Sequence, residues 1–110
     1  MPPLRPLDEL EQTIAERDAN PSEKSYTSKL LIGGVDAIGA KVVEEAAEVV
    51  EAAGEPGDAK REHFIREVGD LVYHLLVLMR LKKCSLADLD AELHRRFGVS
   101  GLDEKASRKY

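Results

Sequence analysis

The stretch that decides the fold is residues 41–51, which read KVVEEAAEVVE. At about 100° per residue, a helix would place Glu44, Glu45 and Glu48 on one side, with Lys41 one turn before them. Small apolar residues would lie on the opposite side: Val42, Ala46, Val49, Val50 and Ala53. The pattern predicts an amphipathic helix whose acidic side is either a solvated face or part of a binding site.

A second pair of acids follows downstream with the spacing of one helix face. Glu67 and Asp70 stand at the head of an apolar run, residues 71–79, which reads LVYHLLVLM. On a helix, four side chains would fall within roughly a sixth of the circumference: His63, Glu67, Asp70 and His74. Two helices that offer carboxylates to a common space predict a site for a hard cation.

Length and composition bound the class of protein. The chain has 110 residues, of which 34% are charged and 43% hydrophobic, and its formal net charge is −5. One domain over residues 1–110 is expected, with a basic C-terminal tail at residues 99–110. The acidic balance and the absence of tryptophan argue against a nucleic acid as a partner.

The sequence also bears on compartment and membrane. The single cysteine, Cys84, rules out an intrachain disulfide and fits a reducing cytoplasm. The start of the chain, MPPLRP, lacks the apolar segment of a signal peptide. The longest apolar run, residues 71–79, is too short to span a bilayer. The sequence therefore predicts a cytoplasmic protein with no membrane partner.

Apolar spacing and capping residues predict the helices. The first begins near Pro6 and ends near Asn20, because a residue before proline disfavours helix. A polar loop follows at residues 21–27. Residues 28–32 are expected to form a short helical turn, and the glycine pair at 33–34 is expected to be a helix break and hinge.

Three longer helices are predicted in the order of the chain. The second runs from about Val35 to Ala53 and the third from Asp58 to about Lys83, long enough to suggest packing against a second subunit. A capping box of Ser85 and Asp88 begins the fourth. Its apolar stripe would be Leu86, Leu89, Leu93 and Phe97, and Gly98 would end it. The predicted fold is all-α, a bundle of four to five helices.

The acids need compensation if they lie among apolar side chains. An ionised carboxylate in such surroundings costs several kcal/mol unless a cation pairs with it. Lys41 would serve Glu67 or Asp70, but the nearby sequence supplies too few cations for five acids. Clustered carboxylate oxygens suit Mg²⁺ or Mn²⁺, and Mg²⁺ takes phosphate oxygens as further ligands. The acids therefore point to a phosphorylated substrate.

Plainer interpretations of the same residues stay open. Glu67 and Asp70 would also suit a buried ion pair with one of three cations: Lys41, Arg66 or Arg80. His74 is expected to be a satisfied core histidine or a donor to a neighbouring ligand, whereas His63 and His94 are expected at the surface. A carboxylate di-iron bundle needs Glu-x-x-His on two helices, and neither helix has that spacing.

Together these residues resemble a known family. Glu44-Glu45-x-x-Glu48, followed after a turn by Glu67-x-x-Asp70, is similar to the motif pair of the all-α nucleoside triphosphate pyrophosphatases. Three further stretches narrow the resemblance to the phosphoribosyl-ATP pyrophosphatases of the second step of histidine biosynthesis: SYTSKLL at 25–31, DLVYHLLVL at 70–78 and SGLDEKASRK at 100–109. The resemblance covers nearly the whole chain, residues 7–109.

The resemblance implies hydrolysis of 1-(5-phosphoribosyl)-ATP to the monophosphate form and pyrophosphate, with Mg²⁺ as cofactor and Mn²⁺ as a substitute. Carried over to this sequence, the metal-binding acids are Glu45, Glu48, Glu67 and Asp70. Glu44 would hold a second ion or orient water. A carboxylate of the group that is free of direct ligation would accept the proton, and Glu44 and Glu48 are the candidates. The candidates for binding the substrate phosphates are Lys41, Lys105, Arg108 and Lys109.

The resemblance also implies an obligate homodimer or larger assembly, because the superfamily forms its sites in dimers or tetramers. One cysteine and three histidines are too few for the metal site of a fused cyclohydrolase, so a stand-alone pyrophosphatase is expected. Two other functions stay open. One is a housecleaning pyrophosphatase that acts on ordinary or damaged nucleoside triphosphates, and the other is a non-enzymatic helical interaction module.

Overall fold

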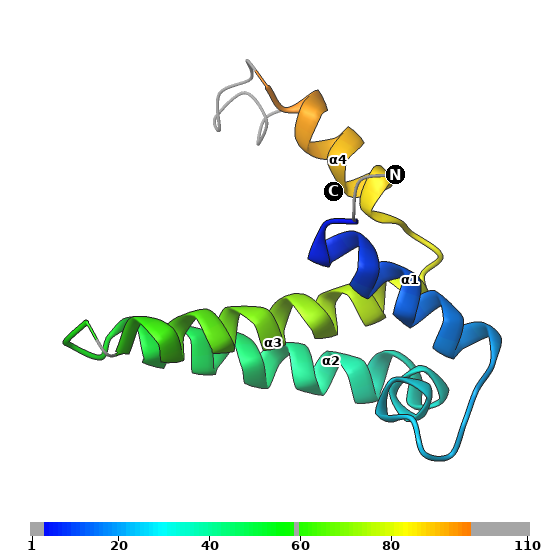
Figure 1. Cartoon of the computed structure of the whole chain (residues 1–110), viewed down its shortest axis with the longest axis horizontal. Helices are drawn as coiled ribbons and strands as arrows, with labels where there is room; N and C mark the ends of the chain where they lie inside the picture. The colour runs from blue at the N-terminus through cyan, green and yellow to red at the C-terminus, as the bar shows by residue number, and fades with distance from the viewer. Residues whose placement is uncertain (1–3, 59, 98–110) are drawn as a thin grey trace.

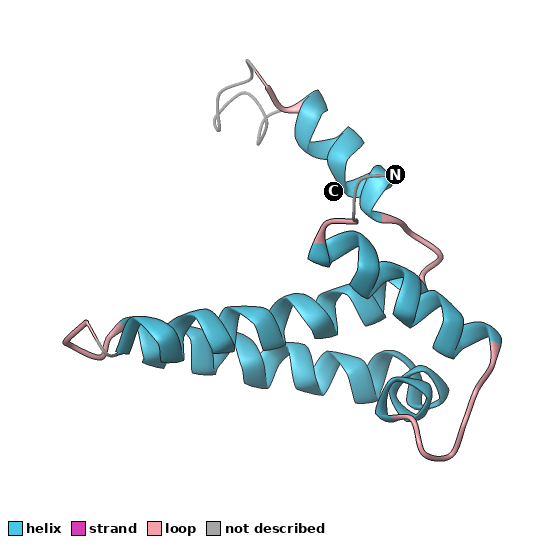
Figure 2. Ribbon diagram, in the orientation of Figure 1, coloured by secondary structure: helices cyan, strands magenta, loops and turns pink. Residues whose placement is uncertain are grey.

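In a computed structural model, the described part of the chain comprises residues 4–58 and 60–97. It contains four helices: α1 (Pro6–Ala19), α2 (Tyr26–Ala53), α3 (Lys60–Leu81) and α4 (Leu86–Arg95). Within these residues there is no strand (Figure 2), and the predicted all-α class is confirmed. No helix of the described part is long and apolar enough for a membrane span.

Local sequence explains where α1 ends and α2 begins. The Asn20 amide donates to the Glu16 carbonyl at 2.9 Å, and Pro21 follows directly, so the predicted end of α1 is confirmed. The Ser25 hydroxyl then accepts a hydrogen bond from the Ser28 amide at 3.1 Å and caps α2. This cap makes α2 begin at Tyr26, earlier than the predicted short turn.

The second helix bends sharply at Gly34. This residue has φ 74° and ψ −160°, a backbone conformation that is open essentially to glycine alone. Residues 26–33 consequently run in a different direction from the rest of α2 (Figure 1). The predicted helix break is confirmed, the hinge stays a prediction, and the segment before the break is about two turns long.

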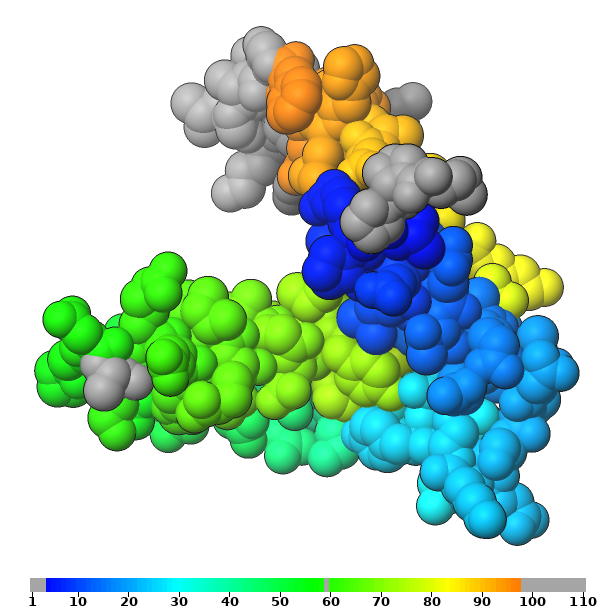
Figure 3. All heavy atoms as spheres, viewed as in Figure 1, coloured from blue at the N-terminus to red at the C-terminus, as the bar shows by residue number. Residues whose placement is uncertain are grey.

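The longer part of α2 and α3 lie side by side as an antiparallel hairpin, and α1 packs across one end of it (Figure 1). The core forms at that end from five buried apolar side chains: Ile14, Leu30, Ile38, Leu76 and Val77. The closed end of the hairpin projects beyond α1 and α4 (Figure 3). There α3 begins at Lys60, two residues later than the predicted cap at Asp58.

The last helix has the predicted cap but not the predicted packing. The Asp88 amide donates to the Ser85 hydroxyl at 3.2 Å, and the Ser85 amide donates to the Asp88 carboxylate at 2.8 Å. Leu86 packs against the core, but α4 ends at Arg95 and buries none of its side chains fully. The rest of the predicted stripe is exposed: Leu89 by 39%, Leu93 by 46% and Phe97 by 75%.

Candidate metal centre

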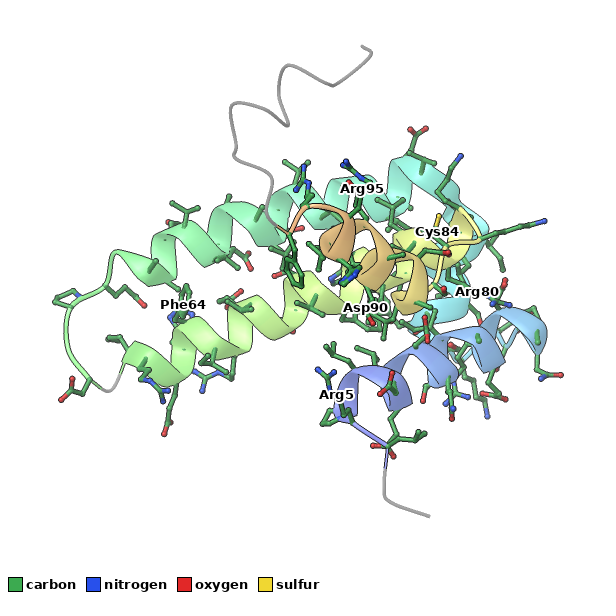
Figure 4. The ribbon with its side chains drawn as sticks, turned by 90° about the horizontal axis from the view of Figure 1, so that it is seen from above. Arg5, Phe64, Arg80, Cys84, Asp90 and Arg95 are labelled. Atoms are coloured by element: carbon green, nitrogen blue, oxygen red, sulfur yellow. The ribbon has the colours of Figure 1, made fainter. Side chains whose placement is uncertain are left out.

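Three acids from the two helices of the hairpin lie together. Glu45 comes from α2, whereas Glu67 and Asp70 come from α3, and one carboxylate oxygen of each lies within 4.8 Å of the others. Figure 4 shows α2 and α3 side by side, with Phe64 near the closed end of the hairpin and Arg80 near the opposite end. The structure thus brings together three of the four acids predicted as metal ligands; we call these three the acid cluster.

Glu45 is buried and Glu67 is partly buried, and each has one oxygen without a hydrogen-bond partner in the described part of the chain. Glu45 is 9% exposed, and the Glu67 side chain is 16% exposed. The Oε2 atoms of both are buried and have no hydrogen-bond partner in the described part of the chain. Because an unpaired polar atom is costly to bury, these two oxygens favour a bound cation.

Glu48, the fourth predicted ligand, stands beside Glu45 at the edge of the acid cluster. Burial, followed by a hydrogen bond with Glu48 and by the charges of Glu48, Asp70 and Glu67, raises the pKa of Glu45 to about 7. Crowded acids of this kind resist a further negative charge. A cation bound among them would relieve that repulsion.

The donor set of the acid cluster fits a hard divalent ion. Its members are carboxylates, and in the described part of the chain no histidine or cysteine belongs to the group. Oxygen ligands suit Mg²⁺, Mn²⁺ or Ca²⁺, whereas softer metals prefer sulfur or imidazole. The unpartnered oxygens of Glu45 and Glu67 are available for ligation, together with the exposed carboxylate of Asp70.

Two cations that the sequence offers to the buried acids are engaged elsewhere. Lys41 Nζ lies 3.4 Å from Glu44, and Arg80 Nε lies 2.8 Å from Asp18 on α1. Arg66 is exposed. The hypothesis of a buried ion pair is therefore wrong for Lys41 and Arg80, and a single lysine does not compensate the acids of α3.

Glu44 faces solvent, although the sequence pattern places it on the same side as Glu45. Its side chain is 55% exposed and pairs with Lys41, whose pKa is raised chiefly by the charge of Glu44. The helix turns by about 100° between neighbouring residues, so Glu45 alone of this pair faces α3. Lys41 and Glu44 form a polar pair next to the acid cluster.

His74 belongs to a hydrogen-bonded network that begins at the backbone carbonyl of Asp70. The other members of this network were not predicted. The Nδ1 atom of His74 donates to the Asp70 carbonyl at 2.8 Å, and the Tyr26 hydroxyl lies 3.1 Å from Nε2. Tyr26 also stacks on Tyr73, whose hydroxyl is hydrogen-bonded to Thr27. His74 is a satisfied core histidine, as predicted, but no local pattern signals a partner 48 positions away.

His63 was predicted at the surface, and its side chain is half-buried at the edge of the acid cluster. Its Nδ1 atom lies 2.6 Å from Glu55 Oε1, and its Nε2 atom lies 3.3 Å from Glu67 Oε1. The spacing of four residues between His63 and Glu67 is a signal that sequence alone contains. The contact with Glu55 has no such signal, because it depends on the turn between α2 and α3.

The basic tail at residues 99–110 lies outside the described part of the chain. Its predicted phosphate-binding residues, Lys105, Arg108 and Lys109, therefore stay predictions from sequence.

Comparison with known proteins identifies the family. The family model for phosphoribosyl-ATP pyrophosphohydrolase matches residues 7–97, which include the whole acid cluster. Curated relatives named phosphoribosyl-ATP pyrophosphatase include one from Rhodopirellula baltica, 54% identical over 96% of this chain and 88% of the relative. Another, from Dechloromonas aromatica, is 45% identical over 93% of this chain and 92% of the relative. A third, from Geotalea daltonii, is 48% identical over 88% of this chain and 89% of the relative. The chain belongs to the phosphoribosyl-ATP pyrophosphohydrolase family.

Proposed function

We propose that this protein hydrolyses 1-(5-phosphoribosyl)-ATP to 1-(5-phosphoribosyl)-AMP and pyrophosphate, with Mg²⁺ as cofactor and Mn²⁺ as a substitute. The family match and the names of the relatives support the substrate. The observation that carries the metal requirement is the pair of buried, unpartnered oxygens on Glu45 and Glu67. The free thiol of Cys84 is exposed, which suits a reducing cytoplasm as the compartment.

The acid cluster would hold the metal ion on the side of α2 that faces α3. A bound Mg²⁺ supplies neutralisation of phosphate charge and a lowered pKa for a bound water. Glu48, which is hydrogen-bonded to Glu45, is our candidate to complete the ligand set and to accept a proton. Glu44 is the second candidate for the proton acceptor, although its pairing with Lys41 holds it at the exposed edge.

Cations would position the phosphates of the substrate. Lys41 pairs with Glu44 at 3.4 Å and is 41% exposed, so its ammonium group remains accessible to an anionic ligand. We propose that it contacts the triphosphate, and that Lys105, Arg108 and Lys109 contact the triphosphate or the ribosyl 5′-phosphate. Positioning and charge neutralisation would then provide most of the rate enhancement.

The experiment that tests this function measures pyrophosphate release, with Mg²⁺, from phosphoribosyl-ATP, ATP and dUTP in parallel. The variants are Glu48→Gln and Asp70→Asn, which keep the side-chain shape and remove a charge. Glu51→Gln, an exposed acid of α2 outside the acid cluster, is the matched control. We expect wild type and the control to release pyrophosphate chiefly from phosphoribosyl-ATP. We expect both variants to lose this activity.

The alternative functions predict different results in the same assay. A housecleaning enzyme would favour ATP or dUTP and would stay largely active after deletion of residues 100–110. An interaction module would release no pyrophosphate, and Mg²⁺ would not raise its melting temperature. Either result would replace the function proposed here.

We also propose that the protein acts as a homodimer or larger homo-oligomer. Val43 and Val50 lie seven residues apart on one face of α2 and are 71% and 72% exposed. On α3, Ile65 is 55% exposed. The exposed valines along α2, together with Ile65 on α3, favour a second copy of the chain as their partner.

A further inference from the structure

Three side chains connect the turn of the hairpin to the acid cluster. Glu55 lies in the turn after α2, His63 near the start of α3, and Glu67 one helical turn farther along. His63 Nδ1 lies 2.6 Å from Glu55 Oε1, and His63 Nε2 lies 3.3 Å from Glu67 Oε1. Each ring nitrogen therefore faces its own carboxylate.

The contact with His63 leaves the two oxygens of Glu67 in different environments. Oε1 meets the imidazole, whereas Oε2 is buried and has no hydrogen-bond partner in the described part of the chain. The same carboxylate lies with Glu45 and Asp70 in the acid cluster. With Oε1 held, Oε2 is the oxygen left for a cation, and the carboxylate loses little further freedom on binding it.

The exposure of the three groups is consistent with a role in orientation. The Glu55 and His63 side chains are each 37% exposed, whereas Glu67 is 16% exposed. Ion pairs at such exposed positions add little to folding stability. The main effect of these contacts therefore falls on Glu67, the least exposed of the three residues.

We propose that His63 is a positioning residue for metal binding: it orients the Glu67 carboxylate, and Glu55 in turn holds the ring of His63. This inference rests on the proposed function, because the orientation of Glu67 matters only if Glu67 is a metal ligand. A variant that keeps the contact with Glu67 should therefore bind metal more tightly than a variant that keeps only the contact with Glu55.

Two substitutions separate the two ring nitrogens. In His63→Gln the amide nitrogen takes about the position of Nε2 and keeps a donor for Glu67. In His63→Asn the shorter amide takes about the position of Nδ1 and keeps the contact with Glu55 alone. We expect His63→Asn to weaken metal binding about 10- to 100-fold and His63→Gln to remain close to wild type. A role confined to the turn predicts the opposite order.

Metal affinity is measured first without substrate, from the loss of the electron paramagnetic resonance signal of free Mn²⁺ as protein is added. The Mg²⁺ concentration for half-maximal pyrophosphate release is then expected to rise in His63→Asn, with kcat at saturating Mg²⁺ little changed. Urea unfolding in the presence of a chelator checks that each variant folds.

The outcomes distinguish this inference from the proposed function. If wild type and His63→Asn bind Mn²⁺ equally well, or if His63→Gln is the weaker of the two variants, the positioning role is overturned and the proposed function stands. If wild type binds no Mn²⁺, both are overturned.

Discussion

At the scale of single residues, one hydroxyl group satisfies a buried histidine beside the acid cluster. Because a backbone carbonyl only accepts, His74 Nδ1 carries the proton that it donates to Asp70, and in the neutral ring Nε2 accepts from the Tyr26 hydroxyl. Tyr26→Phe keeps the ring but leaves Nε2 without a donor. We expect it to lower the free energy of unfolding by about 1–3 kcal/mol in urea titrations.

The companion variant Tyr73→Phe tests this explanation. It also removes one part-buried hydroxyl, but the partner, Thr27, is itself a hydroxyl that can rotate and act as donor or acceptor, whereas Nε2 of a neutral His74 needs a donor. A smaller loss than in Tyr26→Phe is expected. Equal losses in the two variants would contradict the assignment of the His74 proton.

The raised pKa of Glu45 predicts how the stability of the metal-free protein depends on pH. An unfolded Glu45 ionises near 4.5 and the folded one near 7, so the folded state binds more protons between these values. Stability from this group is therefore full below pH 4.5, falls as pH rises toward about 7, and stays low above it. Burial is the first cause of this penalty, and repulsion by the neighbouring acids adds to it.

Glu45→Gln removes the titrating group with little change of shape. In urea unfolding with a chelator, the variant is expected to gain stability over wild type between about pH 5 and about pH 8. Parallel pH profiles for the two proteins would show that Glu45 does not titrate in this range.

Sequence spacing identified the acids but not their supporting residues. Glu67 and Asp70 share a face because helical periodicity puts residues three apart together. Tyr26 and Glu55 meet their partners across a bend and a turn, whose directions no spacing rule provides. The prediction that Lys41 neutralises an acid of α3 was wrong for a related reason. Lys41 pairs instead with Glu44, one turn away on its own helix.

At the scale of elements, the bend in α2 places the Tyr26 segment against α3. Gly34 takes φ 74° and ψ −160° there, and a Cβ atom would have open space, so any cost of Gly34→Ala comes from the backbone alone. We expect this variant to lose about 1–3 kcal/mol of unfolding free energy in urea titrations.

Gly39→Ala is the matched control for that experiment. Gly39 lies in the same helix with helical backbone angles, and a Cβ atom there would also meet nothing within 4 Å. Alanine should therefore stabilise the helix by about 0.5–1 kcal/mol. Similar effects of the two substitutions would mean that the bend does not require glycine.

Helix boundaries were predictable where residues at the boundary itself determine the end of the helix. Ser85 with Asp88, and Asn20 before Pro21, determine their ends through hydrogen bonds and steric limits that operate within a few residues. The packing of α4 was not predictable, because an apolar stripe shows that a partner is needed and not where it lies. Phe97, predicted in the stripe, stays 75% exposed.

At the scale of the whole molecule, the exposed apolar face of α2 predicts self-association. Val50→Glu puts a charge into that face, and we expect it to shift the protein toward the mass of one chain in light scattering coupled to size-exclusion chromatography. Lys29→Glu, which also alters charge at an exposed position of α2, is the control and should leave the mass unchanged. A wild type already at the mass of one chain would contradict the proposed assembly.

Val50 shows that the hydrophobic pattern of a helix does not determine which of its apolar residues are buried within one chain. Periodicity assigned it to the buried side of its helix with Val42, and Val42 does pack against the core. Val50 is 72% exposed, because α3 covers only part of that side. A hydrophobic pattern reports that a side chain avoids water, and it does not distinguish a core from an interface.

All the carboxylates of the acid cluster come from the stretch between positions 45 and 70, on the two sides of one turn. The first and last helices supply none of them. Selection for metal binding therefore bears on one short block of the gene, while the flanking blocks serve folding, assembly and the proposed contacts with the substrate phosphates. Lineages should accumulate less divergence in that block than in the segments that code for the first and last helices.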